Sequence, residues 1–490
     1  MDSAAAAVSA PGPETAPAPT EGRTLAGILR APRLDPYWMA GALFVLYTAL
    51  SVTRHRRMLT LSWDIGIFEQ AIRTYAHFQA PVADLKGPGV NILGDHFSPI
   101  TALVAPLYRL FPTPVTLLVV QAALFALSAV PVVRLAAGKL GRARGLAIGI
   151  AYGFSWGIQR AVDFDFHEIA FAMPLLAFSL EAVVGRRWRA ALWWALPLAL
   201  VKEDLGVTVA AIGAAILLLE RRDRRHGPDG VPRDTSATTV GGILVVYGLA
   251  ASALALGVAI PAFNNSGSYD YWNKIDGGST AAIPPLTAVR TLLWILLPTT
   301  GLLALRSPVA LVALPTIAWR FVSHDDHYWG TDWHYNAVLM PVVLIALTDA
   351  LATAHHSPRA WLRRYARQLP AAVAGAALAF SASLPLYTLT EPATYEIPAS
   401  VKATERLLAR IPDGATVEAS DVAAISRLTS RCRVFWWGDT RGITPAYTVQ
   451  RVDDGRPVKD LLADAARTHP GARYELLGVE GTTVVLKRVA

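Results

Sequence analysis

The sequence predicts a polytopic α-helical membrane protein that ends in a small soluble α/β domain. Of its 490 residues, 53% are hydrophobic and only 17% are charged, and the mean hydropathy is positive at +0.36. About eleven apolar segments approach the roughly 20 residues that a transmembrane helix needs. This apolar character falls after about residue 390. The composition therefore excludes an ordinary soluble globular protein over most of the chain.

The apolar segments define the expected crossings of the membrane. The segments 189–201 and 204–219 are short, and they form either two crossings or one broken, re-entrant pair that other protein segments cover. The other segments are long enough for one helix each. The expected helices are 37–53, 114–137, 143–159, 167–184, 189–201, 204–219, 239–261, 286–304, 307–322, 336–353 and 370–388.

Basic residues set the expected orientation, because Lys and Arg gather in cytoplasmic loops. If the N-terminus is cytoplasmic, most basic loop residues lie inside, so the net charge of +8 reflects topology and indicates no nucleic-acid partner. The exception is residues 54–57 (Arg-His-Arg-Arg), which fall outside. They either bind lipid headgroups or an anionic substrate, or the first span is misassigned. The inner residues are Arg23, Arg30, Arg33, Arg134, Lys139, Arg142, Arg144, Arg186, Arg187, Arg189, Arg221, Arg222, Arg224, Arg225, Arg306, Arg359, Arg363, Arg364 and Arg367.

The chain divides into three predicted regions. Residues 1–30 form a disordered tail that lacks the pattern of a secretory signal. Residues 31–390 form the membrane domain, with a long first outer loop at 54–113. Residues 391–490 form an extracytoplasmic α/β domain. We therefore expect a multi-pass protein of the cell membrane, with a cytoplasmic N-terminus and a C-terminal domain outside. We expect helices at 401–411, 421–428 and 458–467, strands at 415–419 and 433–437, and a hairpin over 474–487.

The first outer loop carries a polar motif, Ser62–Gln70, directly after the first span. Apolar residues recur there at helical spacing, which predicts an amphipathic helix lying in the membrane interface. Asp64 falls near the start of this helix. It is either a helix N-cap or a functional carboxylate, and the two roles are compatible. Glu69 is a candidate for substrate binding. The apolar residues are Ile65, Phe68, Ile72 and Tyr75.

Two further motifs lie on the same predicted side. Asp95 and His96, in Gly94–Pro99, suit metal binding, proton transfer or mutual pairing, or else a capped turn. Asp165 and His167 lie in residues 163–168 (Asp-Phe-Asp-Phe-His-Glu). Ionisable residues at the edge of a bilayer are costly and usually functional. The alternative is a solvated loop, which the interleaved phenylalanines disfavour.

Lys202, Glu203 and Asp204 interrupt the apolar stretch 190–219. Lys202 is a candidate for holding a phosphate, and the alternative is an outer turn with a local ion pair. A denser cluster follows Arg320, a second candidate phosphate partner. It offers histidines and aromatic rings for substrate binding but matches no zinc signature. Its members are His324, His327, Trp329, His334 and Tyr335.

Other chemistries find little support in the sequence. No Walker loop or dinucleotide-binding glycine motif is present, which argues against cytoplasmic nucleotide chemistry. Cys432 is the single cysteine, so an intrachain disulfide and a cysteine metal cluster are excluded. A divalent cation remains a candidate cofactor, and its candidate ligands are Asp64, Asp95, His96 and His167.

Four ordered motifs resemble the bacterial membrane-protein family labelled domain of unknown function 2079. They are a Trp-Asp-x-Gly-x-Phe-x-Gln stretch (63–70), Gly-Asp-His-Phe-Ser-Pro (94–99), Asp-Phe-His (165–167) and Lys-Glu-Asp-x-Gly (202–206). This family looks related to the GT-C glycosyltransferases, which use lipid-linked sugars outside the cytoplasm. In those enzymes an aspartate of the first outer loop is a catalytic base or metal ligand, and Asp64 occupies the matching place.

The resemblance implies sugar transfer from a polyprenyl-phosphate donor to an extracytoplasmic acceptor, with membrane lipid as a partner. Asp64 would deprotonate or orient the acceptor hydroxyl, and Lys202 and Arg320 would balance the leaving phosphate. A transporter or flippase, and a non-catalytic protein of envelope assembly, are the alternatives. The candidate catalytic residues are Asp64, Asp95, His96, Asp165 and His167. The candidate substrate-binding residues are Glu69, Lys202, Glu203, Asp204, Arg320, His324, His327, Trp329, His334 and Tyr335.

Overall fold

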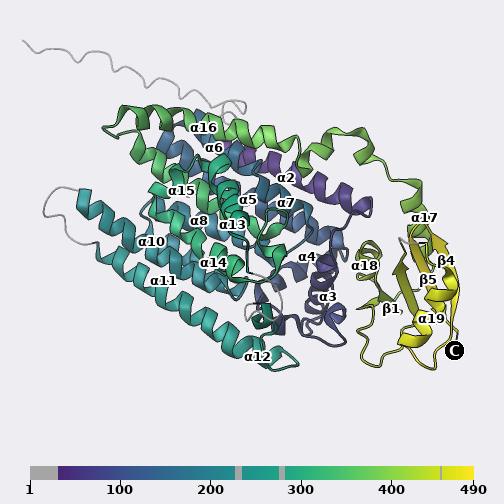
Figure 1. The fold of residues 1–490 in the computed structure, drawn as a ribbon. Helices are drawn as coiled ribbons and strands as arrows, with labels where there is room; N and C mark the ends of the chain where they lie inside the picture. Colours follow the sequence, from purple (N-terminus) through teal and green to yellow (C-terminus); the bar gives the residue numbers. More distant parts are fainter. Residues whose placement is uncertain (1–30, 227–233, 275–281, 453–454, 490) are drawn as a thin grey trace, which may run out of the picture.

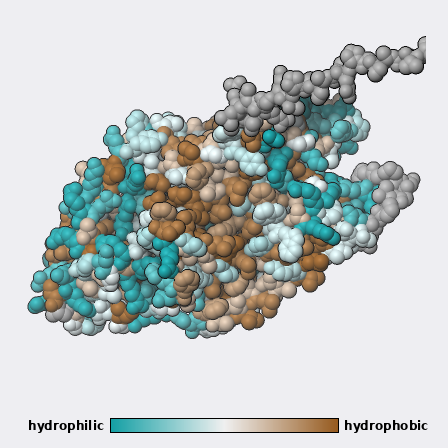
Figure 2. All heavy atoms as spheres, turned by 180° about the vertical axis from the view of Figure 1, so that it is seen from behind, coloured by the Kyte–Doolittle hydropathy of each residue, from teal (hydrophilic) through white to brown (hydrophobic). Residues whose placement is uncertain are grey.

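The computed structural model describes residues 31–226, 234–274, 282–452 and 455–489, so the predicted tail at 1–30 lies outside the described residues. A large bundle of helices makes up most of the molecule. A small mixed α/β domain, formed by the C-terminal residues, lies at one end of this bundle (Figure 1). Hydrophobic side chains form a band across the middle of the surface, between more hydrophilic ends (Figure 2). Such a band is the surface that a protein presents to the interior of a bilayer.

The helices of the bundle follow the predicted apolar segments with shifted ends. A segment that is apolar on all sides, such as α8 or α15, lies in the centre, because it has no polar face to expose. The bounds are α2 (Asp35–Arg56), α4 (Ala105–Leu110), α5 (Pro114–Leu140), α6 (Arg142–Gly153), α7 (Trp156–Asp163), α8 (Ala172–Val184), α9 (Trp188–Ala195), α10 (Leu205–His226), α11 (Thr235–Leu254), α12 (Ile260–Phe263), α13 (Pro285–Thr300), α14 (Leu314–Val322), α15 (Leu339–Ala354) and α16 (Ala360–Ser381).

Four helical spans among the described residues are long and apolar enough to cross a membrane: Pro32–Arg56, Pro114–Leu140, Thr235–Phe263 and His334–Ala354. The predicted number of about eleven is therefore not confirmed. Several predicted crossings are broken or short. The segment 143–159 divides into α6 and α7, and 189–201 becomes the eight-residue α9 followed by a five-residue 3-10 helix.

The C-terminal domain is built on a five-stranded mixed sheet with the order β2-β1-β3-β5-β4. The strand β1 pairs in parallel with β2 and β3, whereas β5 pairs antiparallel with β3 and β4. The predicted helices and strands are found within a few residues, but the central strand β3 was missed. The bounds are α17 (Ala399–Leu408), β1 (Thr416–Ala419), α18 (Val422–Leu428), β2 (Arg433–Trp436), β3 (Tyr447–Arg451), α19 (Val458–Thr468), β4 (Tyr474–Glu480) and β5 (Thr483–Arg488).

Helix α3 (Asp64–Ala76) lies between the bundle and the C-terminal domain, and nine of its thirteen residues are buried. Gln70 Nε2 donates to the Val434 carbonyl at 2.8 Å, and Arg73 donates to the Thr429 carbonyl at 2.7 Å. The prediction that this helix lies in the membrane interface is therefore wrong, because the C-terminal domain covers its second face.

Gly66 shows how closely the two parts approach at α3. A Cβ atom at this position would lie 2.8 Å from both Ile425 Cγ2 of α18 and Leu85 Cδ1. Carbon atoms do not pack at that distance, so a larger residue here would have to displace the Ile425 and Leu85 side chains. The glycine of the first motif thus serves the contact with the C-terminal domain.

The basic stretch at 54–57 also has partners within the protein. Arg54 Nε lies 2.8 Å from Asp163 Oδ1, and the His55 carbonyl accepts a hydrogen bond of 2.7 Å from Arg427 of α18. These contacts hold the end of α2 to the third motif and to the C-terminal domain. They account for two of the basic residues that break the charge rule.

Candidate active site

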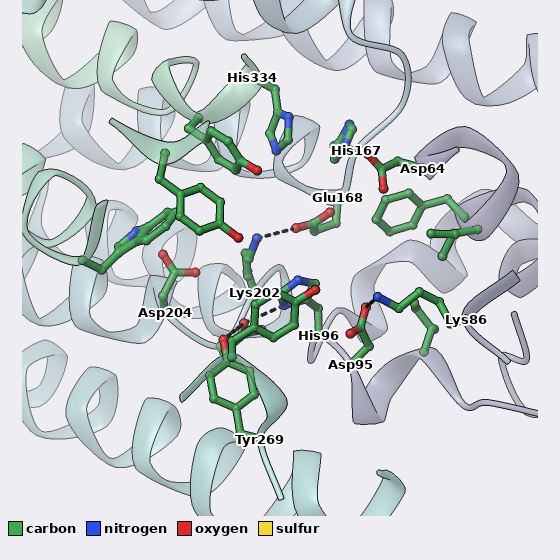
Figure 3. A pocket seen from close by; sticks show the side chains of 18 of the residues that line it. Asp64, Lys86, Asp95, His96, His167, Glu168, Lys202, Asp204, Tyr269 and His334 are labelled. Atoms are coloured by element: carbon green, nitrogen blue, oxygen red, sulfur yellow. Dashed lines mark hydrogen bonds and ion pairs between the residues drawn. The ribbon is translucent and has the colours of Figure 1, made fainter. Parts of the chain in front are cut away.

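A cavity of about 470 Å³ opens at the end of the bundle beside the C-terminal domain. All the sequence motifs send side chains into it (Figure 3). Nine predicted site residues line it, together with residues from two segments that the prediction left out. The predicted ones are Asp64, Asp95, His96, His167, Lys202, Glu203, Asp204, His334 and Tyr335; the additional polar ones include Lys86, Glu168, Tyr269 and Tyr271.

Asp64 is the first residue of α3, and its side chain does not cap the helix, so the N-cap interpretation is wrong. Instead Ser62 Oγ donates to Asp64 Oδ2 at 2.6 Å, and His167 Nε2 lies 3.3 Å from the same oxygen. Burial alone would raise the pKa of Asp64, but the hydrogen bonds from His167 and Ser62 and the charges of His167 and Lys86 together outweigh burial and leave the pKa below the usual value. Asp64 is therefore a carboxylate at neutral pH, and the helix dipole favours that charge.

The position of His167 is set by Gln121 of α5. The Gln121 amide accepts from the His167 backbone N–H at 3.0 Å and donates to the Asp165 carbonyl at 2.6 Å. Asp165, two residues before His167, has a left-handed backbone with a φ of 72°. This conformation is uncommon for residues other than glycine. The His334 ring stacks on the His167 ring with centroids 3.8 Å apart. This turn therefore presents a fixed imidazole to Asp64.

Lys202 lies across the cavity and pairs with Glu168 at 3.2 Å, with both side chains largely buried. Burial disfavours the charged lysine, but Glu168 and its acidic neighbours outweigh burial and raise the pKa of Lys202 well above the usual value. The ammonium group stays charged in a site with limited access to water. A fixed cation of this kind can stabilise a phosphate group.

Glu203 connects its own motif with the second motif and with Tyr269, and its carboxylate has little capacity left for a ligand. Its carboxylate accepts from His96 Nδ1 at 2.8 Å, from the Phe97 backbone N–H at 3.1 Å and from the Tyr269 hydroxyl at 2.8 Å. Burial opposes the charge, but His96 outweighs it and lowers the pKa of Glu203 to about 2. The pKa of His96 is raised, because Glu203 outweighs the opposing effect of burial. We therefore assign Glu203 and His96 to positioning the site.

Asp95 pairs with Lys86, a residue of the same outer loop. Lys86 Nζ lies 3.1 Å from Asp95 Oδ2 and 6.0 Å from the centre of the Trp63 ring. Lys86 thus brings a second cation close to Asp64. The sequence pattern gave no sign of it, since an isolated lysine in a long loop carries no motif. Tyr269 and Tyr271 could have been found from the Tyr-Asp-Tyr-Trp run at 269–272, which follows a predicted span.

Six predicted site residues do not line the cavity. Arg320 is fully buried, and its guanidinium donates to the Tyr328 and Gly330 carbonyls and to Asn336 Oδ1 at 2.7 to 2.8 Å. It therefore holds the 328–336 loop, which corrects its predicted contact with phosphate. The others are Glu69, Asp165, His324, His327 and Trp329.

Trp329 and the histidines before it also differ from expectation. Trp329 is buried, and its Nε1 donates to the Ser323 carbonyl at 2.7 Å, so it packs within the loop. His324 and His327 do not share a helical face, because α14 ends at Val322. The side chain of His327 is 67% exposed beside Asp325, outside the cavity.

The predicted cation ligands do not converge on one point. Asp64 contacts His167, Asp95 contacts Lys86, and His96 contacts Glu203. Over the described residues, the group of carboxylates and histidines whose ligand atoms lie within 4.8 Å of one another is Asp325, Asp326 and His327. The four predicted cation ligands thus do not gather into one metal site.

Glu69 lies behind the cavity, between α3 and the C-terminal domain. Its carboxylate accepts from the Tyr108 hydroxyl at 2.9 Å and from the Thr429 hydroxyl. Burial outweighs these hydrogen bonds and raises the pKa of Glu69 to about 7. The buried carboxyl is therefore held between its neutral and charged forms near neutral pH.

We expect this carboxyl to make stability depend on pH. Its pKa in the folded protein exceeds the unfolded value, so its contribution is complete below about pH 4.5 and is lost as pH rises through about 7. The loss amounts to about 3 kcal/mol. Thermal unfolding in detergent between pH 5 and 8 should show Tm falling with pH, and Glu69→Gln should reduce that slope. The exposed variant Glu391→Gln is the control. An unchanged slope in Glu69→Gln would remove Glu69 as the cause.

The fold of the chain is similar to that of known proteins. The sequence matches no curated protein, but solved structures of ArnT from Cupriavidus metallidurans have a similar fold. ArnT bound to undecaprenyl phosphate aligns with a TM-score of 0.58 at 14% identity, over 93% of this chain and 98% of that one. The apo state gives 0.50 at 14% identity, over 92% and 98%.

The similarity to ArnT establishes the fold of this chain, and a match to a family model establishes its family. The chain has an ArnT-like fold with a small C-terminal sheet. The model for a predicted membrane protein, DUF2079, matches residues 54–428, which covers all four motifs. The protein is therefore a multi-pass membrane protein, and it belongs to the DUF2079 family.

Proposed function

We propose that the protein is a glycosyltransferase that moves a sugar from a polyprenyl-phosphate donor to an acceptor hydroxyl on the extracytoplasmic side. The observation that carries this proposal is the cavity itself. It combines an ionised carboxylate, Asp64, with a buried cation, Lys202, between aromatic walls. The similar structure of ArnT contains undecaprenyl phosphate, which supports a polyprenyl carrier here.

The distribution of charge supports the extracytoplasmic placement. The ends of α5, α8 and α10 remote from the cavity carry the arginines of the predicted inner loops. Among them are Arg134, which pairs with Glu181 at 2.7 Å, and Arg222, which pairs with Asp349 at 3.0 Å. By the positive-inside rule that end faces the cytoplasm. The cavity and the C-terminal domain then face outward.

The proposed reaction exchanges one C–O bond for another. The acceptor oxygen attacks the anomeric carbon, the bond from that carbon to the phosphate oxygen breaks, and polyprenyl phosphate leaves. Asp64 accepts the hydroxyl proton. Both contacts of its carboxylate with described residues fall on Oδ2, so Oδ1 is the oxygen available for the proton. Lys202 stabilises the charge that grows on the leaving phosphate.

Reconstitution of the purified protein in vesicles tests this proposal. We expect it to consume one of a panel of undecaprenyl-phosphate sugars and to release undecaprenyl phosphate, measured by mass spectrometry. Failure to cleave any donor in the presence of envelope extracts would contradict the proposal. Movement of the intact lipid across the bilayer without cleavage would instead support a flippase.

A further inference from the structure

A second cavity, of about 420 Å³, adjoins the first at the edge of the C-terminal domain. Lys86, Asp95 and Tyr271 line both cavities, so these three residues form a shared wall. Three segments far apart in sequence build the second cavity: the 86–95 part of the outer loop, the 264–271 segment after α12, and Arg441 of the C-terminal domain. Its other lining residues are Val90, Asn91, Gly94, Asn264, Asn265, Ser266 and Asp270.

The two cavities differ in chemistry. Val90 is the one aliphatic side chain among the eleven residues that line the second cavity. Three amides, two hydroxyls, two carboxylates and two cations supply most of the rest, with no large excess of either charge. Such groups offer both donors and acceptors at short range, which suits a ligand with many hydroxyl groups. The reaction cavity, by contrast, has apolar and aromatic walls that include Ile67, Phe68, Trp272 and Trp319.

The walls of the second cavity are fixed by specific contacts. Asn264 Nδ2 donates to the Gly94 carbonyl at 2.8 Å and to Asp270 Oδ2 at 3.1 Å. A Cβ atom on Gly94 would lie 2.5 Å from the backbone of Phe263 and Asn264, so the second motif is packed directly on the 263–264 backbone. The glycine of that motif thereby helps to shape this cavity.

We propose that the second cavity binds the acceptor, and that the acceptor is a carbohydrate whose hydroxyl group reaches Asp64 past the pair of Lys86 and Asp95. This inference rests on the proposed function. It assigns separate places to the two substrates, with the lipid-linked donor in the aromatic cavity and the hydrophilic acceptor in the polar one. Asp95 would accept a hydrogen bond from the incoming sugar in exchange for its contact with Lys86.

Residues of the shared wall separate the proposed donor cavity from the proposed acceptor cavity. The Tyr271 ring packs against His96 with centroids 4.5 Å apart, and His96 is held by Glu203. Donor and acceptor can therefore occupy neighbouring cavities at the same time. Transfer between two bound substrates requires this arrangement, because an acceptor that entered through the donor cavity would have to compete with the sugar.

The single native cysteine allows a direct test. Cys432 is buried, and burial raises the pKa of its thiol, so it should react slowly with a charged methanethiosulfonate reagent. Ser266→Cys places an accessible thiol in the second cavity, since Ser266 is exposed. Ser400→Cys, which lies in an exposed position of the C-terminal domain outside both cavities, is the matched control. Methyl glycosides and short oligosaccharides serve as probes, both free and as glycolipid headgroups in vesicles.

We expect two results. A carbohydrate probe should slow the modification of Ser266→Cys at least tenfold without affecting Ser400→Cys. Modification of Ser266→Cys should lower sugar transfer at least tenfold, while release of undecaprenyl phosphate through slow donor hydrolysis continues. Free and lipid-attached probes separate a soluble glycan from a glycolipid as the source of the carbohydrate.

Other results would overturn the inference. If no carbohydrate protects Ser266→Cys, or if modification leaves transfer unchanged, the second cavity does not bind the acceptor. If modification stops donor hydrolysis as strongly as transfer, the cavity belongs to the donor. If carbohydrate protects the thiol but no donor is ever cleaved, the proposed function fails and the carbohydrate site stands.

Discussion

Asp64→Asn should lower the rate of sugar transfer by about 100- to 10,000-fold, the range that general bases contribute. The amide has nearly the same size as the carboxyl group but cannot accept the hydroxyl proton. Donor binding should persist, because Lys86 and Lys202 remain in place. The effect therefore belongs in kcat, measured with a saturating undecaprenyl-phosphate sugar. Transfer at the rate of the unchanged protein would show that Asp64 is not the base.

Two further variants separate chemistry from structure at this position. Asp413→Asn changes an aspartate whose side chain is 82% exposed, and it should leave the rate unaltered. Ser62→Ala removes the hydrogen bond of 2.6 Å to Asp64 but keeps the carboxylate. It should cost less than Asp64→Asn, since a hydrogen bond to a charged group contributes about 1.5–3 kcal/mol and the proton acceptor itself remains.

Lys202→Met should reduce both stability and activity, for different reasons. It leaves the Glu168 carboxylate, which is 2% exposed, as an uncompensated buried charge at a cost of about 3–5 kcal/mol. The double variant Lys202→Met with Glu168→Gln removes that charge and should recover most of the lost Tm. Activity should stay about 100- to 1000-fold below normal, as expected when a preorganised stabilising group is lost.

The matched control is a buried pair at the opposite end of the bundle. Arg222→Met with Asp349→Asn removes another ion pair, of 3.0 Å, without approaching the cavity. It should change Tm but not kcat. Recovery of activity together with stability in the Lys202 and Glu168 double variant would assign Lys202 a structural role only.

Topology accounts for what could be predicted from sequence. The motifs at 63–70, 94–99, 165–167 and 202–206 all fell on one predicted side of the membrane, and nine of the predicted residues do line one cavity. Hydrophobic length and basic loops are strong signals, because the cost of burying a charge in lipid is large. The same signals register apolar composition and not the breaks within it, so the predicted number of about eleven crossings is not confirmed.

The contacts that the candidate site residues make within the fold could not be predicted from the sequence. Arg320 carried the chemistry of a phosphate ligand, yet three oxygens of its own loop surround it. Of the four candidate cation ligands, Asp64 and His167 contact each other, whereas Asp95 and His96 pair with Lys86 and Glu203. Lys86 and Gln121 have no local signature, because their roles depend on contacts with residues distant in the chain. The type of a side chain indicates its possible roles, whereas the partners that it meets in the folded protein decide which role it has.

The position of α3 between the bundle and the C-terminal domain has a consequence for biogenesis. Gln70 bonds to a carbonyl 364 residues further along the chain, and contacts of such separation form late in folding. During synthesis the helix that carries Asp64 must wait for residues 422–436 before its second face is covered. The protein would thus be inserted in the membrane in an inactive form, and the site would be completed only when the last domain has folded.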